Sequence, residues 1–225
     1  MKSILRLIRF ENLIIVAAIQ IIIRLCLIYP NIAGYYSKIL GIKLDLQFSN
    51  IDFALLVLAT VFITAAGYVI NDYFDISTDI LNHPDSVIID KKISRRTAMS
   101  IHWILNILGV LIGFYLSWRI EIFNIGFIFV FAAGLLWFYS TIFNKELLIG
   151  NIIVAILTAL VPILVIIFDI IPLNFVYKDQ LRMYYLNFNI IIFWGLGLSY
   201  FAFITTLIRE IIKDIEDYEG DNAYG

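Results

Sequence analysis

The stretch LNFNIIIFWGLGLSYFAFITTL, from Leu186 to Leu207, contains no Asp, Glu, Lys or Arg. A helix needs about 20 mainly apolar residues to cross a bilayer, so this stretch predicts a transmembrane helix. The whole chain of 225 residues is similar in character, being 62% hydrophobic and only 15% charged. A soluble domain has about 25% charged residues. The composition therefore excludes an ordinary water-soluble domain.

Five further apolar runs are long enough to span a membrane. The six predicted spans are approximately Ile4–Tyr29, Ile51–Ile70, Ile101–Trp118, Ile122–Phe143, Leu147–Ile171 and Leu186–Leu207. They lack the alternating polarity of outer-membrane β-strands. We therefore predict an all-α, polytopic transmembrane helix bundle that forms a single domain over residues 1–225.

The basic residues favour one orientation in the membrane. With the N-terminus inside, ten of the 16 Lys and Arg fall on the inner side and six, including Arg24, on the outer side. The positive-inside rule then predicts a cytoplasmic N-terminus. The net charge of −2 leaves no basic surface of the kind that binds nucleic acid. The partners expected from this composition are membrane lipids.

The acidic residues gather in two patches, each directly after a span. Eleven of the 18 Asp and Glu lie within residues 72–90 and 210–221. Four spans separate the patches, and because this number is even, both patches must emerge on the same side of the membrane. With the N-terminus inside, that side is the cytoplasmic one.

Each patch places three aspartates at positions i, i+3 and i+7. They are Asp72, Asp75 and Asp79 in the first patch and Asp214, Asp217 and Asp221 in the second. No Gly or Pro interrupts the first patch before Pro84, so we expect the second span to continue through it as one helix face. Carboxylates stacked in this way repel one another. Mg²⁺ would offset the repulsion, since it takes one or two carboxylates and completes its shell with substrate phosphates. The alternative is two solvated helix ends.

At these residues the chain resembles a known family. The motif Asn-Asp-x-x-Asp-x-x-x-Asp after the second span, paired with Asp-x-x-Asp-x-x-x-Asp after the sixth, is similar to the UbiA superfamily of intramembrane prenyltransferases. The wording of the second motif, REIIKDIEDYEGD from Arg209 to Asp221, is most similar to the branch that includes digeranylgeranylglyceryl phosphate synthases.

The resemblance implies an enzyme and its substrates. It implies Mg²⁺-dependent transfer of a polyprenyl group, with geranylgeranyl favoured, from its diphosphate to a lipophilic acceptor. A glycerol-phosphate lipid is the favoured acceptor, and an aromatic acid or quinone precursor is the alternative. From other classes, an ion-coupled transporter and a catalytically inactive relative remain open. The transporter is disfavoured because the acids cluster at one membrane face rather than at mid-membrane.

The resemblance also implies roles for individual residues. The six aspartates would bind Mg²⁺, and four of them, Asp75, Asp79, Asp214 and Asp217, would be catalytic. The residues expected to line the cavity or contact the diphosphate are Asn12, Asn71, Lys91, Lys92, Tyr139, Lys145, Asn151, Arg209 and Lys213.

Two features depart from the family pattern. Ser86 stands where the family has an Arg that helps to hold the diphosphate, and Lys91, Lys92, Arg95 or Arg96 could supply that charge instead. The family has nine helices, whereas this chain stops directly after the second motif, so we expect its last three helices to be absent.

Two polar residues outside the motifs are expected to have no functional role. Asp169, near the outer end of the fifth predicted span, is expected to be hydrated at the interface. His102 has no carboxylate or cysteine partner at metal-site spacing, so we expect it to lie in a loop or at the interface.

Overall fold

The computed structural model describes residues 2–82, 87–143 and 148–224, with the backbone alone for residues 81, 82 and 217–224. Within these ranges the regular elements are helices, apart from an isolated bridge between Ile89 and Ile93. In chain order they are α1 (Lys2–Leu7), α2 (Phe10–Ile22), η1 (Ile23–Ile28), η2 (Pro30–Tyr36), α3 (Ser37–Leu40), α4 (Asn50–Phe74), α5 (Ile76–Asn82), α6 (Arg95–Arg119), η3 (Phe123–Gly126), α7 (Phe127–Thr141), α8 (Ile149–Val176), α9 (Lys178–Met183) and α10 (Asn189–Tyr224). The all-α prediction is confirmed.

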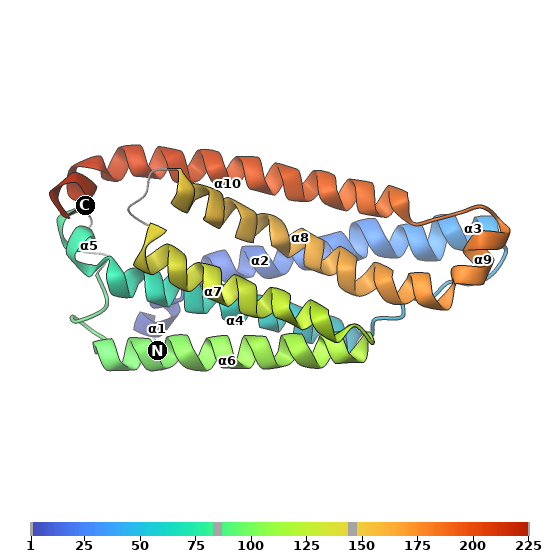
Figure 1. The fold of residues 1–225 in the computed structure, drawn as a ribbon, viewed down its shortest axis with the longest axis horizontal. Coiled ribbons are helices and arrows are strands. Elements are labelled where there is room, and N and C mark those ends of the chain that lie inside the picture. Colours follow the sequence, from blue (N-terminus) through green and yellow to red (C-terminus); the bar gives the residue numbers. More distant parts are fainter. Residues whose placement is uncertain (1, 83–86, 144–147, 225) are drawn as a thin grey trace.

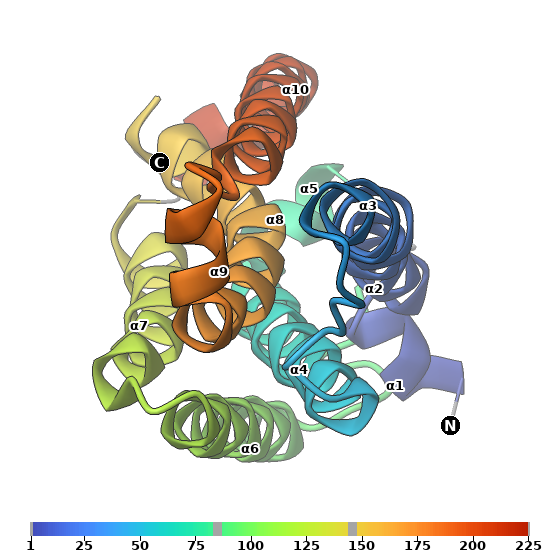
Figure 2. The ribbon, with the colours of Figure 1, turned by 90° about the vertical axis from the view of Figure 1, so that its right-hand side faces the viewer.

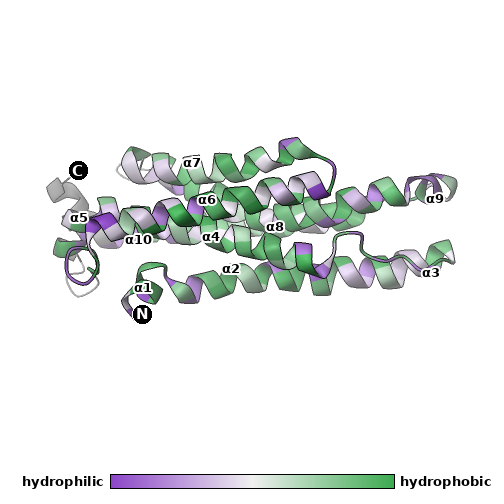
Figure 3. Ribbon diagram, turned by 90° about the horizontal axis from the view of Figure 1, so that it is seen from below, coloured by the Kyte–Doolittle hydropathy of each residue, from purple (hydrophilic) through white to green (hydrophobic). Residues whose placement is uncertain are grey.

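Six helical segments are long and apolar enough to cross a membrane, as predicted. They are Phe10–Leu40, Asn50–Phe74, Arg95–Arg119, Phe123–Thr141, Ile149–Val176 and Asn189–Glu216. The segments run side by side, and hydrophilic residues are concentrated toward the two ends of the bundle, near α5 and near α9 (Figure 3). The protein is therefore an integral membrane protein.

The first span differs from its predicted limits at both ends. Arg9 takes a left-handed backbone conformation (φ 49°), so α1 is a separate helix and the span begins at Phe10. The predicted end at Tyr29 is wrong, because the helical path continues to Leu40. Pro30 does not stop it, since it is the first residue of the π-type segment η2. There the helix has changed to π-type hydrogen bonding, and this change accommodates a residue that has no N–H to donate.

Glycines allow the spans to pack closely in the apolar environment. A Cβ atom at Gly109 would lie 2.7 Å from Cγ1 of Ile63 on α4, and one at Gly113 would lie 2.3 Å from Cδ2 of Phe129 on α7. Hydrophobicity gives little drive for helix association inside lipid, so close packing at small residues takes its place. The packing of α6 against α4 and α7 therefore depends on the close fit of side chains against these glycines.

A buried ion pair joins the first and fifth spans. Arg24 Nε lies 3.5 Å from Asp169 Oδ1, and the two side chains are 3% and 1% exposed. Arg24 also donates to the carbonyls of Phe48 and Ser49. The expectation that Arg24 lies on the outer side is wrong, because the first span extends well beyond Tyr29 and so places Arg24 inside the bundle. The expectation that Asp169 is hydrated at the interface is also wrong, because its side chain is buried against Arg24.

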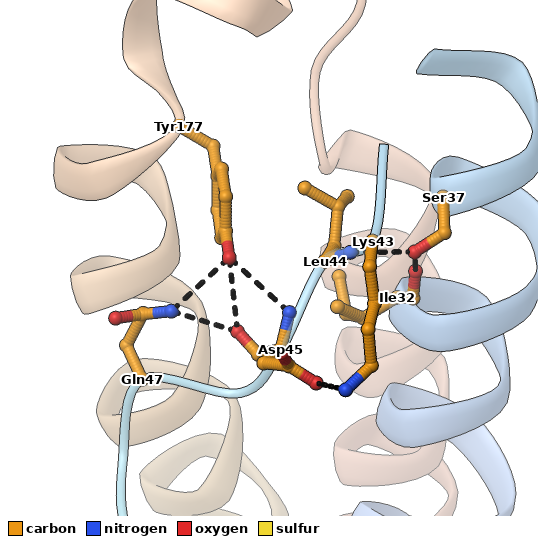
Figure 4. Close-up of polar contacts among 7 residues, drawn as sticks. All are labelled: Ile32, Ser37, Lys43, Leu44, Asp45, Gln47 and Tyr177. Atoms are coloured by element: carbon orange, nitrogen blue, oxygen red, sulfur yellow. Dashed lines mark hydrogen bonds and ion pairs between the residues drawn. The ribbon is translucent and has the colours of Figure 1, made fainter. Parts of the chain in front are cut away.

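At this same half of the molecule the loop before α4 is fastened to the end of α8. The Tyr177 hydroxyl accepts hydrogen bonds from the Asp45 backbone N–H and from Gln47 Nε2, both at 3.2 Å. The Ser37 hydroxyl accepts the Leu44 N–H at 2.8 Å. Figure 4 shows that these bonds converge on one short stretch of loop. These contacts hold the loop against the first and fifth spans.

The two acidic motifs lie together at the opposite end. In Figure 1, α5 and the C-terminal part of α10 meet at the left, near the N-terminal helix α1, whereas α3 and α9 lie at the right. Contacts between α5 and α10 agree with this view. The view along the bundle in Figure 2 shows α8 beside α7 and α10, and α4 beside α6 and α2. The prediction that both patches share one side is confirmed.

Candidate functional site

The first acidic motif begins on α4 and turns at Asp75. The helix ends at Phe74, with Asp75 as its C-cap (φ −88°, ψ 6°), and α5 starts at Ile76. The expectation of one continuous helix face through Asp79 is therefore wrong. The turn brings Ile76 into a small apolar cluster with Leu7 and Val69, and this burial outweighs the helical continuation that the sequence would allow.

Asn71 holds the carboxylate of Asp75 at the turn. Asn71 Nδ2 donates to Asp75 Oδ2 at 2.7 Å, a side-chain bond of the kind that competes with regular helix. The other amide atom, Asn71 Oδ1, is buried and has no hydrogen-bond partner among the described residues. An orphaned buried oxygen costs about 1–3 kcal/mol, so this position favours a ligand that would bind to it.

Arg9 lies against the first motif. Its guanidinium is 2.9 Å from Asp72 Oδ1 and 4.9 Å from the centre of the Tyr68 ring. Burial opposes its charge, but the ion pair with Asp72 outweighs this effect and raises the pKa of Arg9. A left-handed non-glycine residue costs about 1–3 kcal/mol, and these two contacts offset that strain. The break between α1 and α2 thus places the Arg9 guanidinium beside the first acidic motif.

The second motif lies on a continuous helix. α10 extends through Tyr224 without a break, so Asp214, Asp217 and Asp221 follow one another along it as predicted. Asp214 is fixed from α8, because Asn151 Nδ2 donates to its Oδ2 at 2.7 Å. Glu210, one turn earlier, is buried and pairs with Arg209 at 2.5 Å.

Tyr139 lies near both motifs. Its hydroxyl is within electrostatic reach of Glu210 and Asp214 of α10 and of Asp75 of the first motif. The end of α7 can approach α8 this closely because residue 150 is a glycine. A Cβ atom there would lie 2.6 Å from the Phe143 carbonyl and 3.1 Å from Tyr139 Cε2. Lys213 adds a link, since its charge acts on Asp72.

The structure thus brings most of the expected residues to one place. The residues gathered at the acidic end are Asn71, Asp72, Asp75, Asp79, Tyr139, Asn151, Arg209, Lys213 and Asp214. Lys145 and Ser86 lie outside the described residues, and so do the side chains of Asp217 and Asp221.

Three expected contacts stay predictions. Lys91 and Lys92 lie exposed in the turn that follows Ile89, where the Lys92 N–H donates to the Ile88 carbonyl. Asn12 is half-buried near the start of α2.

Two residues gain importance that the sequence interpretation did not give them. In the sequence Arg9 is one of the basic residues on the predicted inner side, and nothing but its place three residues before Asn12 sets it apart. Glu210 was counted only as part of the second acidic patch, and nothing in its spacing distinguishes it from the other acids there. Its burial depends on the packing of α10 against the neighbouring spans.

Six apolar spans whose two aspartate motifs meet at one end define a helical integral membrane protein with a site of oxygen donors. The family model of the UbiA prenyltransferase family matches residues 33–225, and the chain belongs to this family.

Two similar proteins carry the same name. Over 176 residues the chain is 35% identical to the digeranylgeranylglyceryl phosphate synthase of Methanobrevibacter smithii, covering 78% of this chain and 56% of the relative. It is 36% identical to that of Methanothermobacter thermautotrophicus, covering 77% and 54%. The chain thus spans about half the length of the curated relatives it matches.

A solved structure agrees with this assignment. The structure, described as concerning digeranylgeranylglyceryl phosphate synthase in membranes, superimposes with a TM-score of 0.66 at 26% identity. The superposition covers 100% of this chain and 66% of the chain in that structure. The fold of this chain is therefore similar to about two thirds of that structure.

Proposed function

We propose that the chain transfers a geranylgeranyl group from geranylgeranyl diphosphate to a glycerol-phosphate lipid within the membrane. The observation that carries the proposal is the meeting of two aspartate motifs, from α4–α5 and α10, at one end of an apolar bundle. The relatives named digeranylgeranylglyceryl phosphate synthase support the choice of acceptor.

The donor atoms at this end suit Mg²⁺. The carboxylates of Asp72, Asp75, Asp79 and Asp214, with the unpartnered Asn71 Oδ1, are hard oxygen ligands. No three described His, Cys, Asp or Glu side chains are close enough to hold a metal by themselves. Mg²⁺ takes one or two carboxylates and relies on substrate phosphates and water for the rest. Asp217 and Asp221 would extend the set.

Bound Mg²⁺ would neutralise the diphosphate and make it a better leaving group. The bond between C1 of the prenyl chain and the diphosphate oxygen breaks, and the electron pair leaves with the diphosphate. A hydroxyl oxygen of the acceptor then forms the new bond to C1 and releases its proton. Arg9, which contacts Asp72, and Lys213, whose charge acts on Asp72, are the cations that would bind phosphate oxygens.

An aromatic pair next to the first motif suits an allylic cation. The Phe74 and Trp137 rings meet edge to face, with centroids 6.0 Å apart, beside the turn at Asp75. Aromatic faces attract cations, and an apolar wall excludes the water that would capture the cation. The N-terminal orientation favoured by the basic residues would put this site on the cytoplasmic side.

Turnover by the purified chain tests the proposal. Geranylgeranyl diphosphate is supplied with Mg²⁺ and either geranylgeranylglyceryl phosphate or 4-hydroxybenzoate, and product is detected by mass spectrometry. We expect product from the glycerol-phosphate lipid, lost on adding EDTA and in Asp75→Asn and Asp214→Asn. Asp179→Asn, at an exposed position on α9, is the matched control and should retain turnover.

Product from 4-hydroxybenzoate alone would replace the proposed acceptor with an aromatic one. Equal turnover in wild type, Asp75→Asn and Asp214→Asn would show that the acidic end is not the catalytic site.

A further inference from the structure

A groove outside the acidic site opens between α6 and α7. It has a volume of about 440 Å³, within the range of about 300–1,000 Å³ that holds small-molecule ligands. Its outer walls are apolar and exposed, with Trp103 51%, Ile107 54% and Leu111 61% exposed. Since both helices are membrane spans, the groove faces the lipid rather than water.

The floor of the groove is polar. His102 and Asn106, one turn apart on α6, both line it and are only 1% and 8% exposed. The sequence-based expectation that His102 lies in a loop or at the interface is wrong, because its Nδ1 lies 2.9 Å from the Ala66 carbonyl of α4. A histidine–asparagine pair is thus buried under an apolar opening.

The hydrogen bonds of this pair leave one polar atom without a partner among the described residues. With Nδ1–H donating to the Ala66 carbonyl, His102 Nε2 accepts from Asn106 Nδ2 at 3.1 Å. The other tautomer would set a bare Nδ1 against the Ala66 carbonyl, so it is disfavoured. Asn106 Oδ1 is then left with no partner among the described residues. A buried amide oxygen without a donor is costly, and in a membrane no bulk water can reach it.

The chemistry of the missing partner follows from the lining. One acceptor is unpaired, so the partner must offer one donor. None of the residues lining the groove is charged, which disfavours phosphate, carboxylate and amine groups. A hydroxyl satisfies both conditions. The remaining walls, formed by Trp103, Trp137, Val130 and their apolar neighbours, suit a hydrocarbon tail.

We propose that this groove is a second ligand site, which binds a long-chain alcohol from the bilayer with its hydroxyl donating to Asn106 Oδ1. The tail lies between α6 and α7 against Trp103 and Trp137, whose ring centroids are 5.7 Å apart. None of the described acidic residues lines this groove. Its wall residue Trp137 also meets Phe74 beside the turn at Asp75, but binding of an alcohol there does not require the proposed prenyl transfer.

Quenching of Trp103 and Trp137 by a brominated dodecanol tests the proposal in detergent or nanodiscs. The other two tryptophans, Trp118 and Trp194, face lipid and are first changed to Phe to remove their signal. We expect saturable quenching by the alcohol. Bromododecane, which lacks the donor, should bind about tenfold more weakly, since one hydrogen bond to a buried group is worth about a factor of ten.

Two kinds of variant make the test specific. Asn106→Leu should weaken the alcohol to the level of bromododecane. Gly134→Phe should block the groove, because a Cβ at Gly134 meets nothing within 4 Å and the ring can enter the open space. The matched control is Gly197→Phe, at an equally open glycine on α10, which should leave quenching unchanged.

Equal, unsaturable quenching by the alcohol and by bromododecane would overturn the proposal. So would alcohol binding that survives Gly134→Phe, because the groove would then be filled only by lipid chains of no particular chemistry.

Discussion

The buried pair of Arg24 and Asp169 allows a quantitative test of the fold. Its atoms lie 3.5 Å apart, and both side chains are almost fully buried. Neither Asp169 oxygen accepts a hydrogen bond from the described residues, whereas Arg24 also donates to two backbone carbonyls. The attraction is therefore offset by incompletely compensated desolvation of the carboxylate.

Asp169→Leu should destabilise the protein by about 3–5 kcal/mol, because it leaves a buried guanidinium without its counter-charge. Arg24→Met should cost less, since an unpaired Asp can take up a proton and become neutral, whereas Arg stays charged. The double variant should return to within about 1 kcal/mol of wild type or exceed it, because an apolar pair removes both desolvation costs.

Thermal unfolding in detergent, followed by circular dichroism, measures these differences. For a domain of this size each kcal/mol shifts Tm by about 2–4 °C, so Asp169→Leu should lower it by roughly 6–20 °C. Arg95→Gln is the control, because its pair with Asp90 is 56% and 47% exposed and should contribute about 1 kcal/mol or less. A double variant as unstable as the sum of the single variants would refute this reasoning.

Two other predictions concern the site and the packing. Asn151→Leu removes the hydrogen bond that fixes Asp214. In a titration of donor binding with Mg²⁺, it should raise the Mg²⁺ concentration needed for half-maximal binding by about 10–100-fold, because loss of a residue behind a metal ligand lowers metal affinity by that factor. Asn174→Leu, at an exposed position on the same helix, should leave that concentration unchanged. Gly113→Ala should destabilise by about 1–3 kcal/mol because its Cβ would lie 2.3 Å from a packed ring, whereas Gly134→Ala, which meets nothing, should stabilise by about 0.5–1 kcal/mol; equal Tm values for the two would contradict the described packing.

The predictable part of the fold depends on properties of single segments. Each span could be recognised because apolar length alone decides whether a helix crosses a bilayer. The shared side of the two acidic motifs followed from counting spans, without any knowledge of packing. The even number between them suffices, and α5 does meet α10.

The errors arose where contacts between segments decide the outcome. The first span was predicted to end at Tyr29, but the helix continues through Pro30 by a change of hydrogen-bonding pattern. The burial of Ile76 beside Leu7 and the bond from Asn71 break the helix at Asp75, although local sequence would allow it to continue. No local pattern shows either effect.

The same distinction applies to the site. The meeting of the aspartates and Asn71 could be predicted because their motifs have a fixed spacing and resemble a known family, and Asn151 was expected from that resemblance alone. Arg9 could not, because its role depends on a left-handed backbone conformation and on Asp72, 63 residues later in the chain. The pairing of Arg24 with Asp169 likewise joins two spans that are distant in sequence.

The central claim is that the two acidic motifs form one site. Mg²⁺-dependent binding of geranylgeranyl diphosphate should be measured by calorimetry for wild type, Asp75→Asn, Asp214→Asn and the double variant. If the two carboxylates serve one diphosphate, each single change should weaken binding nearly as much as both together, since residues in contact with one ligand are coupled. Strictly additive losses, or wild-type affinity in either single variant, would contradict the account.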